Sequence, residues 1–230
     1  MNSTIYISFA VAPFLILIGI ILLNSGRFKD WGSIRNVLIL GFISVVVVVL
    51  AKYLLDLVWH DNYRGLKRTL FYIVIGLAFT AELFKYIALR IALPKFTAIK
   101  NPIDGIIFGI FLGLGFAMAA NVLIAYRIIG ITPSFYENFK EYFYILLYAY
   151  PFANIVFGVT MGYFVGSGRY RKNPILENLT AIIAAALFHS LFYFSFFTHD
   201  NVLISITSLG FILLVAILIS QAIKTTRRME

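Results

Sequence analysis

The chain of 230 residues contains no cysteine and few charged residues. The absence of cysteine excludes disulfide bonds and thiolate metal ligands, while the redox compartment stays undetermined. Only 13% of the residues are charged and 61% are hydrophobic, well above the roughly 45 to 50% apolar usage of soluble domains. The connections between the apolar runs are too short for a soluble domain. The composition therefore predicts an all-α, polytopic bundle of transmembrane helices.

Seven apolar runs are long enough to cross a bilayer, which takes roughly 20 helical residues. The predicted spans are residues 4–24, 33–58, 69–93, 103–126, 143–166, 175–197 and 201–223. The first run lacks a basic leading region and is followed by Arg27 and Lys29 instead of a small-residue cleavage site, so we interpret it as a retained span and not as a signal peptide. We expect residues 1–230 to form a single transmembrane domain.

The net charge of +9 does not indicate nucleic-acid binding, because the basic residues lie at the ends of spans, where they meet lipid headgroups. With the N-terminus outside, one side of the membrane collects twelve lysines and arginines and the other collects five. The larger set is Arg27, Lys29, Arg35, Arg90, Lys95, Lys100, Arg169, Arg171, Lys172, Lys224, Arg227 and Arg228. The positive-inside rule places this set, and with it the C-terminus, in the cytoplasm. Membrane lipid is the predicted partner, and nucleic acid is not.

Polar side chains interrupt four of the apolar runs. Glu82 and Lys85 lie one helical turn apart in the run 69–93, where a charge costs at least about 2.5 to 3.5 kcal/mol on insertion scales and therefore faces the protein interior. Asn121, Asn154 and His189 each lie in or near the end of another run. We expect these residues to line one polar chamber enclosed by four helices, and this chamber is the candidate site.

The chemistry that these residues can perform is limited by what is missing. A catalytic zinc site usually takes three protein ligands, and only Glu82 and His189 are good ligands within the spans. Asn121 and Asn154 could donate to an oxyanion, but the spans hold no further base to assist Glu82 and His189. Ser190 points about 100 degrees away from His189 on a helix, so serine chemistry is not favoured.

Glycines recur every four residues in two of the spans: Gly105, Gly109 and Gly113 in the fourth, and Gly158, Gly162 and Gly166 in the fifth. Small residues at this spacing let helix backbones approach closely in a membrane. We expect these two spans to pack tightly into the bundle. Between them, residues 133–143 alternate aromatic and charged side chains and predict a short amphipathic segment in the membrane interface.

At these polar residues the chain resembles the PrsW family of intramembrane proteases, which belongs with the CAAX-prenyl endopeptidase type of membrane protein. The resemblance covers residues 76–194. The family pattern Glu-Glu-x-x-Lys reads Ala81-Glu82-Leu83-Phe84-Lys85 here. The family pattern Asp-Gly-Ile, followed by Gly-Phe-Ala-x-x-Glu-Asn, is matched by Asp104, Gly105, Ile106, Gly115, Phe116, Ala117 and Asn121, with Ala120 at the glutamate position. The fifth span matches at Met161, Gly162, Tyr163, Phe164 and Gly166.

The resemblance implies a catalytic set that this chain has largely lost. Asn154 stands at the position of a family histidine, and Tyr193 stands where a member often has aspartate. His189 is kept. Of the four principal catalytic positions that the family assigns in spans three to five, only Glu82 survives, since Ala81, Ala120 and Asn154 cannot activate water or bind a metal well. By resemblance alone, zinc is a possible cofactor and a prokaryotic inner membrane is the location.

Three functions follow from these observations. The first is a proteolytically inactive relative, either a natural pseudoprotease or an inactivated variant, that binds a transmembrane segment of another protein in the polar cavity. The second is an active intramembrane endopeptidase that uses Glu82 and His189. The third is a small proton-linked transporter or channel, although the sequence shows no inverted repeat with paired broken helices.

Overall fold

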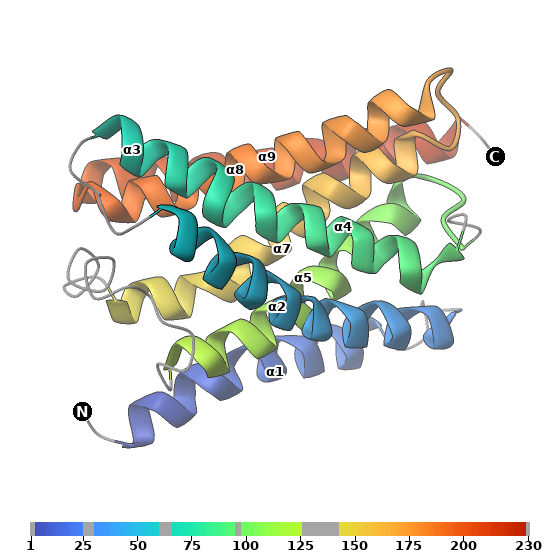
Figure 1. Ribbon diagram of the computed structural model, residues 1–230. Helices are drawn as coiled ribbons and strands as arrows, with labels where there is room; N and C mark the ends of the chain where they lie inside the picture. Colours follow the sequence, from blue (N-terminus) through green and yellow to red (C-terminus); the bar gives the residue numbers. More distant parts are fainter. Residues whose placement is uncertain (1–2, 25–29, 60–65, 95–97, 126–142, 229–230) are drawn as a thin grey trace.

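The computed structural model describes residues 3–24, 30–59, 66–94, 98–125 and 143–228, and the regular elements within these ranges are helices (Figure 1). The elements are α1 (Ser3–Asn24), α2 (Trp31–Trp59), α3 (Leu66–Phe71), η1 (Tyr72–Phe79), α4 (Thr80–Ala92), α5 (Pro102–Ala125), α7 (Phe143–Ser167), α8 (Pro174–Phe197) and α9 (Asn201–Arg227). The predicted all-α fold is confirmed, and each of the seven predicted spans coincides with a helical segment. Most of the amphipathic segment predicted at 133–143 lies outside the described residues.

The third span is one continuous helix, Leu66–Ala92, that changes character in its middle. α3 and α4 are joined by η1, a π-helical stretch in which each turn is wider than in an α-helix. The hydroxyl of Thr80 donates to the carbonyl oxygen of Ile75, five residues earlier, at 2.8 Å. π-Helical turns inside α-helices are frequent at functional sites. The sequence pattern did not predict this one, which ends two residues before Ala81 and Glu82 begin the polar motif.

Five helices in the described part of the chain are long and apolar enough to cross a membrane: Trp31–Leu55, Leu66–Ala92, Pro102–Leu123, Pro174–Phe197 and Asn201–Arg227. α1 adds a shorter apolar stretch, Val11–Ile20. The outer faces of these helices carry large apolar side chains such as Phe42 on α2 and Ile212 on α9. An apolar exterior of this kind suits a protein whose solvent is lipid.

Several helices begin at residues whose side chains cap them. Asn173 accepts a hydrogen bond from the backbone N–H of Leu176 at 3.1 Å just before α8, and Pro174 occupies the first turn. Asp200 accepts from the backbone N–H of Val202 at 2.8 Å before α9. Caps of this kind satisfy donors that have no partner within the helix. They fix where α8 and α9 begin.

α5 lies at the centre of the bundle and packs most extensively against α7. The glycines predicted to pack closely do so: a methyl group added to Gly109 would clash with the carbonyl oxygen of Gly158, and one added to Gly105 would clash with that of Gly162. A methyl group on Gly113 would clash with the backbone carbonyl of Asn154. This glycine seam therefore sets how closely α7, and with it Asn154, approaches the rest of the bundle.

The two ends of the bundle differ in the helix termini they gather (Figure 1). α2 begins, α4 ends, α7 ends and α9 ends at the side on which the C-terminus is drawn, whereas α1 begins at the opposite side. The described basic residues of the larger predicted set therefore lie at the end that carries the C-terminus. Which end faces the cytoplasm stays a prediction.

Candidate functional site

Four polar side chains from three helices meet in the interior of the bundle. Glu82 and Lys85 lie on the same face of α4, and the Lys85 ammonium forms an ion pair with Oε1 of Glu82. The same oxygen lies 2.7 Å from Nδ1 of His189 on α8. The Lys85 ammonium also donates to Oδ1 of Asn154 on α7 at 3.0 Å. We call Glu82, Lys85, Asn154 and His189 the buried polar cluster.

The cluster is closed off from its surroundings, since its four side chains are only 0 to 1% exposed. A carboxylate accepts hydrogen bonds and cannot donate them, so Nδ1 of His189 carries the proton in its contact with Glu82. The other ring nitrogen, Nε2, and the second carboxylate oxygen, Oε2 of Glu82, have no hydrogen-bond partner among the described residues. These two atoms are the groups that are chemically available inside the cluster.

Aromatic rings enclose the imidazole of His189. Phe157 stacks on one side, with ring centroids 4.5 Å apart and the planes inclined by 19°. Tyr193 stacks as well, at 4.9 Å and 22°. Tyr193, predicted to line the site, thus contacts His189 through its ring, while its hydroxyl lies 3.5 Å from that of Tyr150. The ring of His189 is held in a fixed orientation by packing on its faces and by Glu82 at its edge.

Asn154 links the cluster to the backbone of its own helix. Its amide nitrogen donates to the carbonyl oxygen of Tyr150 at 2.9 Å, while its amide oxygen accepts from Lys85. An asparagine with both amide atoms bonded is fixed in one orientation. Ser190, next to His189 in sequence, donates to the carbonyl oxygen of Ala186 at 2.6 Å, in agreement with the expectation that it does not serve His189.

The remaining predicted site residues lie in the core. Ala81 precedes Glu82 on α4 and is buried, and Ala120 and Asn121 are buried on α5. α5 reaches the cluster through Phe116, whose ring centroid lies 4.8 Å from Nζ of Lys85. The hydrogen bonds and the ion pair described above join α4, α7 and α8. The roles of Ala81, Ala120 and Asn121 stay predictions.

Three aromatic residues around the cluster were not predicted from the sequence: Tyr150, Phe116 and Phe157. The ring centroid of Phe157 lies 5.4 Å from Nζ of Lys85. With 23 phenylalanines and 14 tyrosines in the chain, aromatic identity alone gives no signal. Helical spacing gives one, since Tyr150 and Phe157 lie four residues before and three residues after Asn154, on the same face of α7.

The donor set of the cluster does not fit a catalytic zinc ion, which usually takes three protein ligands and one water. No group of three or more histidine, aspartate or glutamate side chains is placed to hold a metal ion within the described part of the chain. Glu82 and His189 are the two good ligands, and one oxygen of Glu82 is already bound by the Lys85 ammonium. We therefore derive no chemistry through a metal ion at this site.

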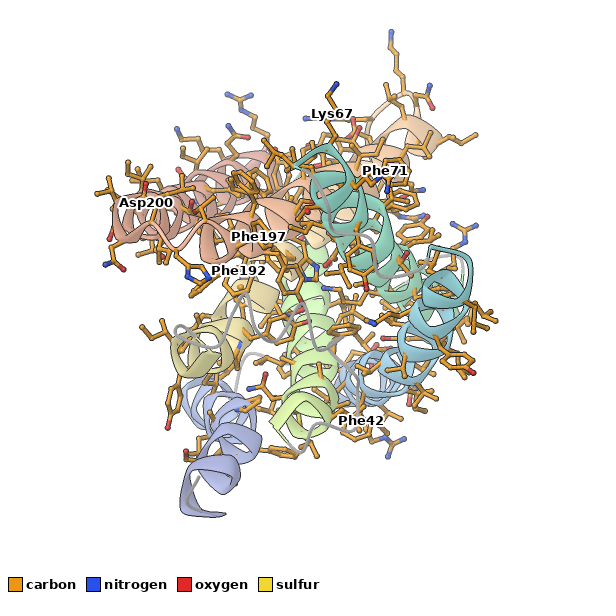
Figure 2. The ribbon with its side chains drawn as sticks, turned by 60° about the vertical axis from the view of Figure 1, so that its left-hand side comes forward. Phe42, Lys67, Phe71, Phe192, Phe197 and Asp200 are labelled. Atoms are coloured by element: carbon orange, nitrogen blue, oxygen red, sulfur yellow. The ribbon has the colours of Figure 1, made fainter. Side chains whose placement is uncertain are left out.

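A groove of about 410 Å³ lies beside the cluster, between α7, α8 and α9. We call it the α7–α9 groove; its lining includes Phe152, Ala153, Phe192, Phe196, Thr207 and Phe211. Figure 2 shows Phe192 in the space between α8 and α7, where its ring lies 6.1 Å from Phe157 and 6.2 Å from Tyr150. We call the rings around the cluster, those of Phe116, Tyr150, Phe157 and Tyr193, its aromatic shell. Phe192 therefore forms part of the wall between the groove and this aromatic shell.

Comparisons with known proteins agree with the motifs in the sequence. Residues 29–221 match the model of the PrsW family of intramembrane metalloproteases. A protein named Protease PrsW from Oceanobacillus iheyensis is 26% identical over 189 residues, which cover 82% of this chain and 81% of that protein. A second Protease PrsW, from Clostridioides difficile, is 30% identical over 171 residues, which cover 70% of this chain and 65% of that protein. No solved structure matches the chain.

Proposed function

The chain belongs to the PrsW family of intramembrane metalloproteases. We propose that it is a membrane-embedded member that does not hydrolyse peptide bonds and that binds a transmembrane segment of another protein. The absence of hydrolysis is proposed from the contacts of the Glu82 carboxylate. Its Oε1 accepts from both Lys85 and His189. Positions 81 and 120 are alanines, and the described residues place no second carboxylate in the cluster to share the work.

Peptide hydrolysis needs a group that takes a proton from water and groups that stabilise the developing oxyanion. In this chain the candidate base, Glu82, already neutralises a buried ammonium. The neutral amide of Asn154, which by resemblance stands at the position of a family histidine, is bonded at both its atoms. The resemblance implies that the residues at 81, 120 and 154 replace three catalytic groups, and the loss of any one of them would slow the reaction.

The binding half of the proposal is supported by the α7–α9 groove. The polar cluster is too buried to touch a partner, but the groove beside it is open, apolar and bordered by exposed side chains such as Phe152 and Ile212. The groove has a volume of about 410 Å³, which suits side chains. In this proposal a partner helix lays a row of side chains into the groove while its backbone stays outside, as in helix-in-groove recognition.

The hydrolysis half is tested by restoring the missing groups. The chain as it stands is compared with the variant Ala81→Glu/Ala120→Glu/Asn154→His on a single-span model substrate in detergent and in liposomes, with the bound metal measured in each. We expect no cleavage by the original chain. Cleavage by the original chain that disappears in Glu82→Gln would overturn the proposal.

The binding half is tested by photocrosslinking from the groove. A benzoylphenylalanine replaces Phe152, which borders the groove, or Ile39, which is similarly exposed on α2. We expect adducts with a single-span membrane protein, identified by mass spectrometry, from position 152 and not from position 39. Filling the groove with Ala153→Trp should abolish these adducts. Adducts that are equal at both positions, or that survive Ala153→Trp, would refute a specific groove.

One observation favours a second candidate function, an active endopeptidase. Glu82 and His189 are 2.7 Å apart, which is the distance of a working acid–base pair. In that case both Glu82→Gln and His189→Gln would abolish cleavage of the model substrate by the original chain, whereas Ser190→Ala would not.

We also propose the orientation that the charges predict, with the C-terminus in the cytoplasm of a prokaryotic cell. The relatives from Oceanobacillus iheyensis and Clostridioides difficile support this setting. Reporter enzymes that are active only in the cytoplasm or only outside it, fused after Glu230, give opposite results for the two orientations.

A further inference from the structure

Lys85 places a cation at the centre of the buried polar cluster. Its ammonium forms the ion pair with Glu82 and donates to Oδ1 of Asn154 at 3.0 Å. The rings of Phe116 and Phe157 lie 4.8 and 5.4 Å from the same nitrogen, within the range of cation–π attraction. The side chain is 1% exposed. An ammonium so surrounded has exchanged its water for oxygens and π faces that the protein supplies.

The contacts also determine the net charge of the cluster. Glu82 contributes one negative charge and Lys85 one positive charge, and Asn154 is neutral. His189 directs its Nδ1 proton at Glu82, and a second proton on Nε2 would be a buried charge with no hydrogen-bond partner among the described residues. Buried charges without partners are costly, so the imidazole is neutral. The cluster is therefore electroneutral with Lys85 as its one cation.

A divalent metal ion would disturb this arrangement in two ways. It would add two positive charges to a neutral, desolvated cluster, and it would compete with the ammonium for the single carboxylate. Ala81 and Ala120 supply no further carboxylate to compensate the added charge. Asn154 offers a neutral amide oxygen that Lys85 already uses.

We propose that Lys85 is the resident cation of this site: its ammonium takes the role of a positive ion for Glu82, joins α4 to α7 through Asn154, and excludes a divalent metal ion from the cluster. The inference rests on the proposed function in that both use the same two-ligand donor set. It goes further by naming the group that is bound to the Glu82 carboxylate, and by predicting that the cluster is stable without a bound metal ion.

Zinc binding tests the exclusion directly. Four purified proteins are compared in detergent: the original chain, Lys85→Met, Asn154→His, and Lys85→Met/Asn154→His. Zinc bound per chain and the shift of Tm on adding zinc are measured for each. The double variant offers three ligands and no competing ammonium, so we expect it to bind about one zinc ion per chain and to gain Tm. We expect the original chain and Asn154→His to do neither.

Two outcomes of the zinc experiment overturn the proposal. If the original chain or Asn154→His binds zinc stoichiometrically, Lys85 does not exclude a metal ion. If the double variant binds no more zinc than Asn154→His, removal of the ammonium has changed nothing and the exclusion has another cause.

A charge-coupling experiment tests the neutralising role without any metal. Glu82→Gln and Lys85→Met each leave one buried charge unpaired, and each should lower Tm by roughly 10 °C. The combined variant Glu82→Gln/Lys85→Met leaves no unpaired charge, and its Tm should lie above that of either single variant. If a single variant does not fold, recovery of folded protein in the combined variant is the readout. Additive losses in the combined variant would show that the two charges do not neutralise one another.

These experiments separate failure of this inference from failure of the proposed function. Cleavage of the model substrate by the zinc-free original chain would refute the proposed function and leave the role of Lys85 intact. Stoichiometric zinc in the original chain without cleavage would refute the role of Lys85 alone.

Discussion

The glycine seam between α5 and α7 allows a sharp prediction from a single methyl group. In Gly158→Ala the new carbon would lie 2.7 Å from the carbonyl carbon of Gly109, and closer still to its oxygen. Ordinary contacts between carbon atoms are about 3.5 to 4.0 Å. The two helices must therefore move apart by about 1 Å, because both clashing groups are backbone and cannot rotate away. The movement would also loosen the neighbouring contacts of Gly105 with Gly162 and of Gly113 with Asn154.

The magnitude follows from overpacking, which typically costs about 1 to 3 kcal/mol. Replacing glycine by alanine in a helix also returns up to about 1 kcal/mol of helix propensity. Gly210→Ala on α9 is the matched control, because an added methyl group there meets nothing within 4 Å. The difference between the two variants isolates the clash. For a chain of this size we expect a Tm for Gly158→Ala roughly 3 to 10 °C below that of Gly210→Ala.

The assay is thermal unfolding in detergent, followed by circular dichroism and by loss of monomer in size-exclusion chromatography. Equal Tm values for the two variants would refute the close packing of α5 against α7. A larger loss in Gly210→Ala would place the critical seam on α9 instead.

Three further predictions concern the ring of Phe157, the cap of α8 and the ion pair of Arg171. Phe157→Ala removes the ring that stacks on His189 and lies beneath Lys85, and it should lower the free energy of unfolding by about 3 to 5 kcal/mol. Phe157→Tyr should lower it far less, and similar unfolding curves for the two variants would contradict the packing. Asn173→Ala removes the cap of α8 and should lower the free energy of unfolding by about 1 kcal/mol, whereas Asn173→Asp should keep the cap. An unchanged Tm in Asn173→Ala would show that the cap does not stabilise the helix. The hydrogen bond that Arg171 donates to the Glu177 carboxylate raises the pKa of Arg171. As the pH rises, the stability that this bond contributes is therefore lost only above a pH of about 12. Arg171→Gln should thus lower stability by less than about 1 kcal/mol, with no change in the effect between pH 6 and 9; a marked change over that range would show that another group titrates there.

Much of the fold was predictable because a bilayer restricts what an apolar run can do. A run of about 20 apolar residues has to satisfy its backbone within itself, and the helix is the solution. The predicted spans, and the expectation that the two glycine-rich helices pack tightly into the bundle, followed from length and spacing alone. The π-helical stretch η1 did not, because the wider turn depends on how residues 72–79 pack and on the bond from Thr80 to Ile75, not on a repeat in the sequence.

The candidate site was predictable only in part. The spacing of Glu82 and Lys85 places them on one face of a helix, so their ion pair could be foreseen. The approach of Asn154 and His189 depends on how α7 and α8 are placed beside α4, which spacing within one helix does not determine. The expected chamber is in fact a closely packed cluster whose aromatic shell separates it from the α7–α9 groove. Three of its rings were missed because they come from α5 and α7, and only tertiary structure brings these helices beside Lys85 and His189.

The buried charges raise one question of function that a stability measurement and a crosslinking measurement can answer together. Replacing both partners of a buried ion pair by uncharged residues of similar size is often neutral or stabilising, because the desolvation cost is removed with the attraction. If Glu82→Gln/Lys85→Met keeps the Tm of the original chain, the pair is not needed for the fold. The crosslinks from position 152 then decide its role: their loss in this stable variant would mean that the charges shape the groove for its partner. Their persistence would mean that the groove binds through its apolar lining alone, with the cluster a remnant that the fold tolerates.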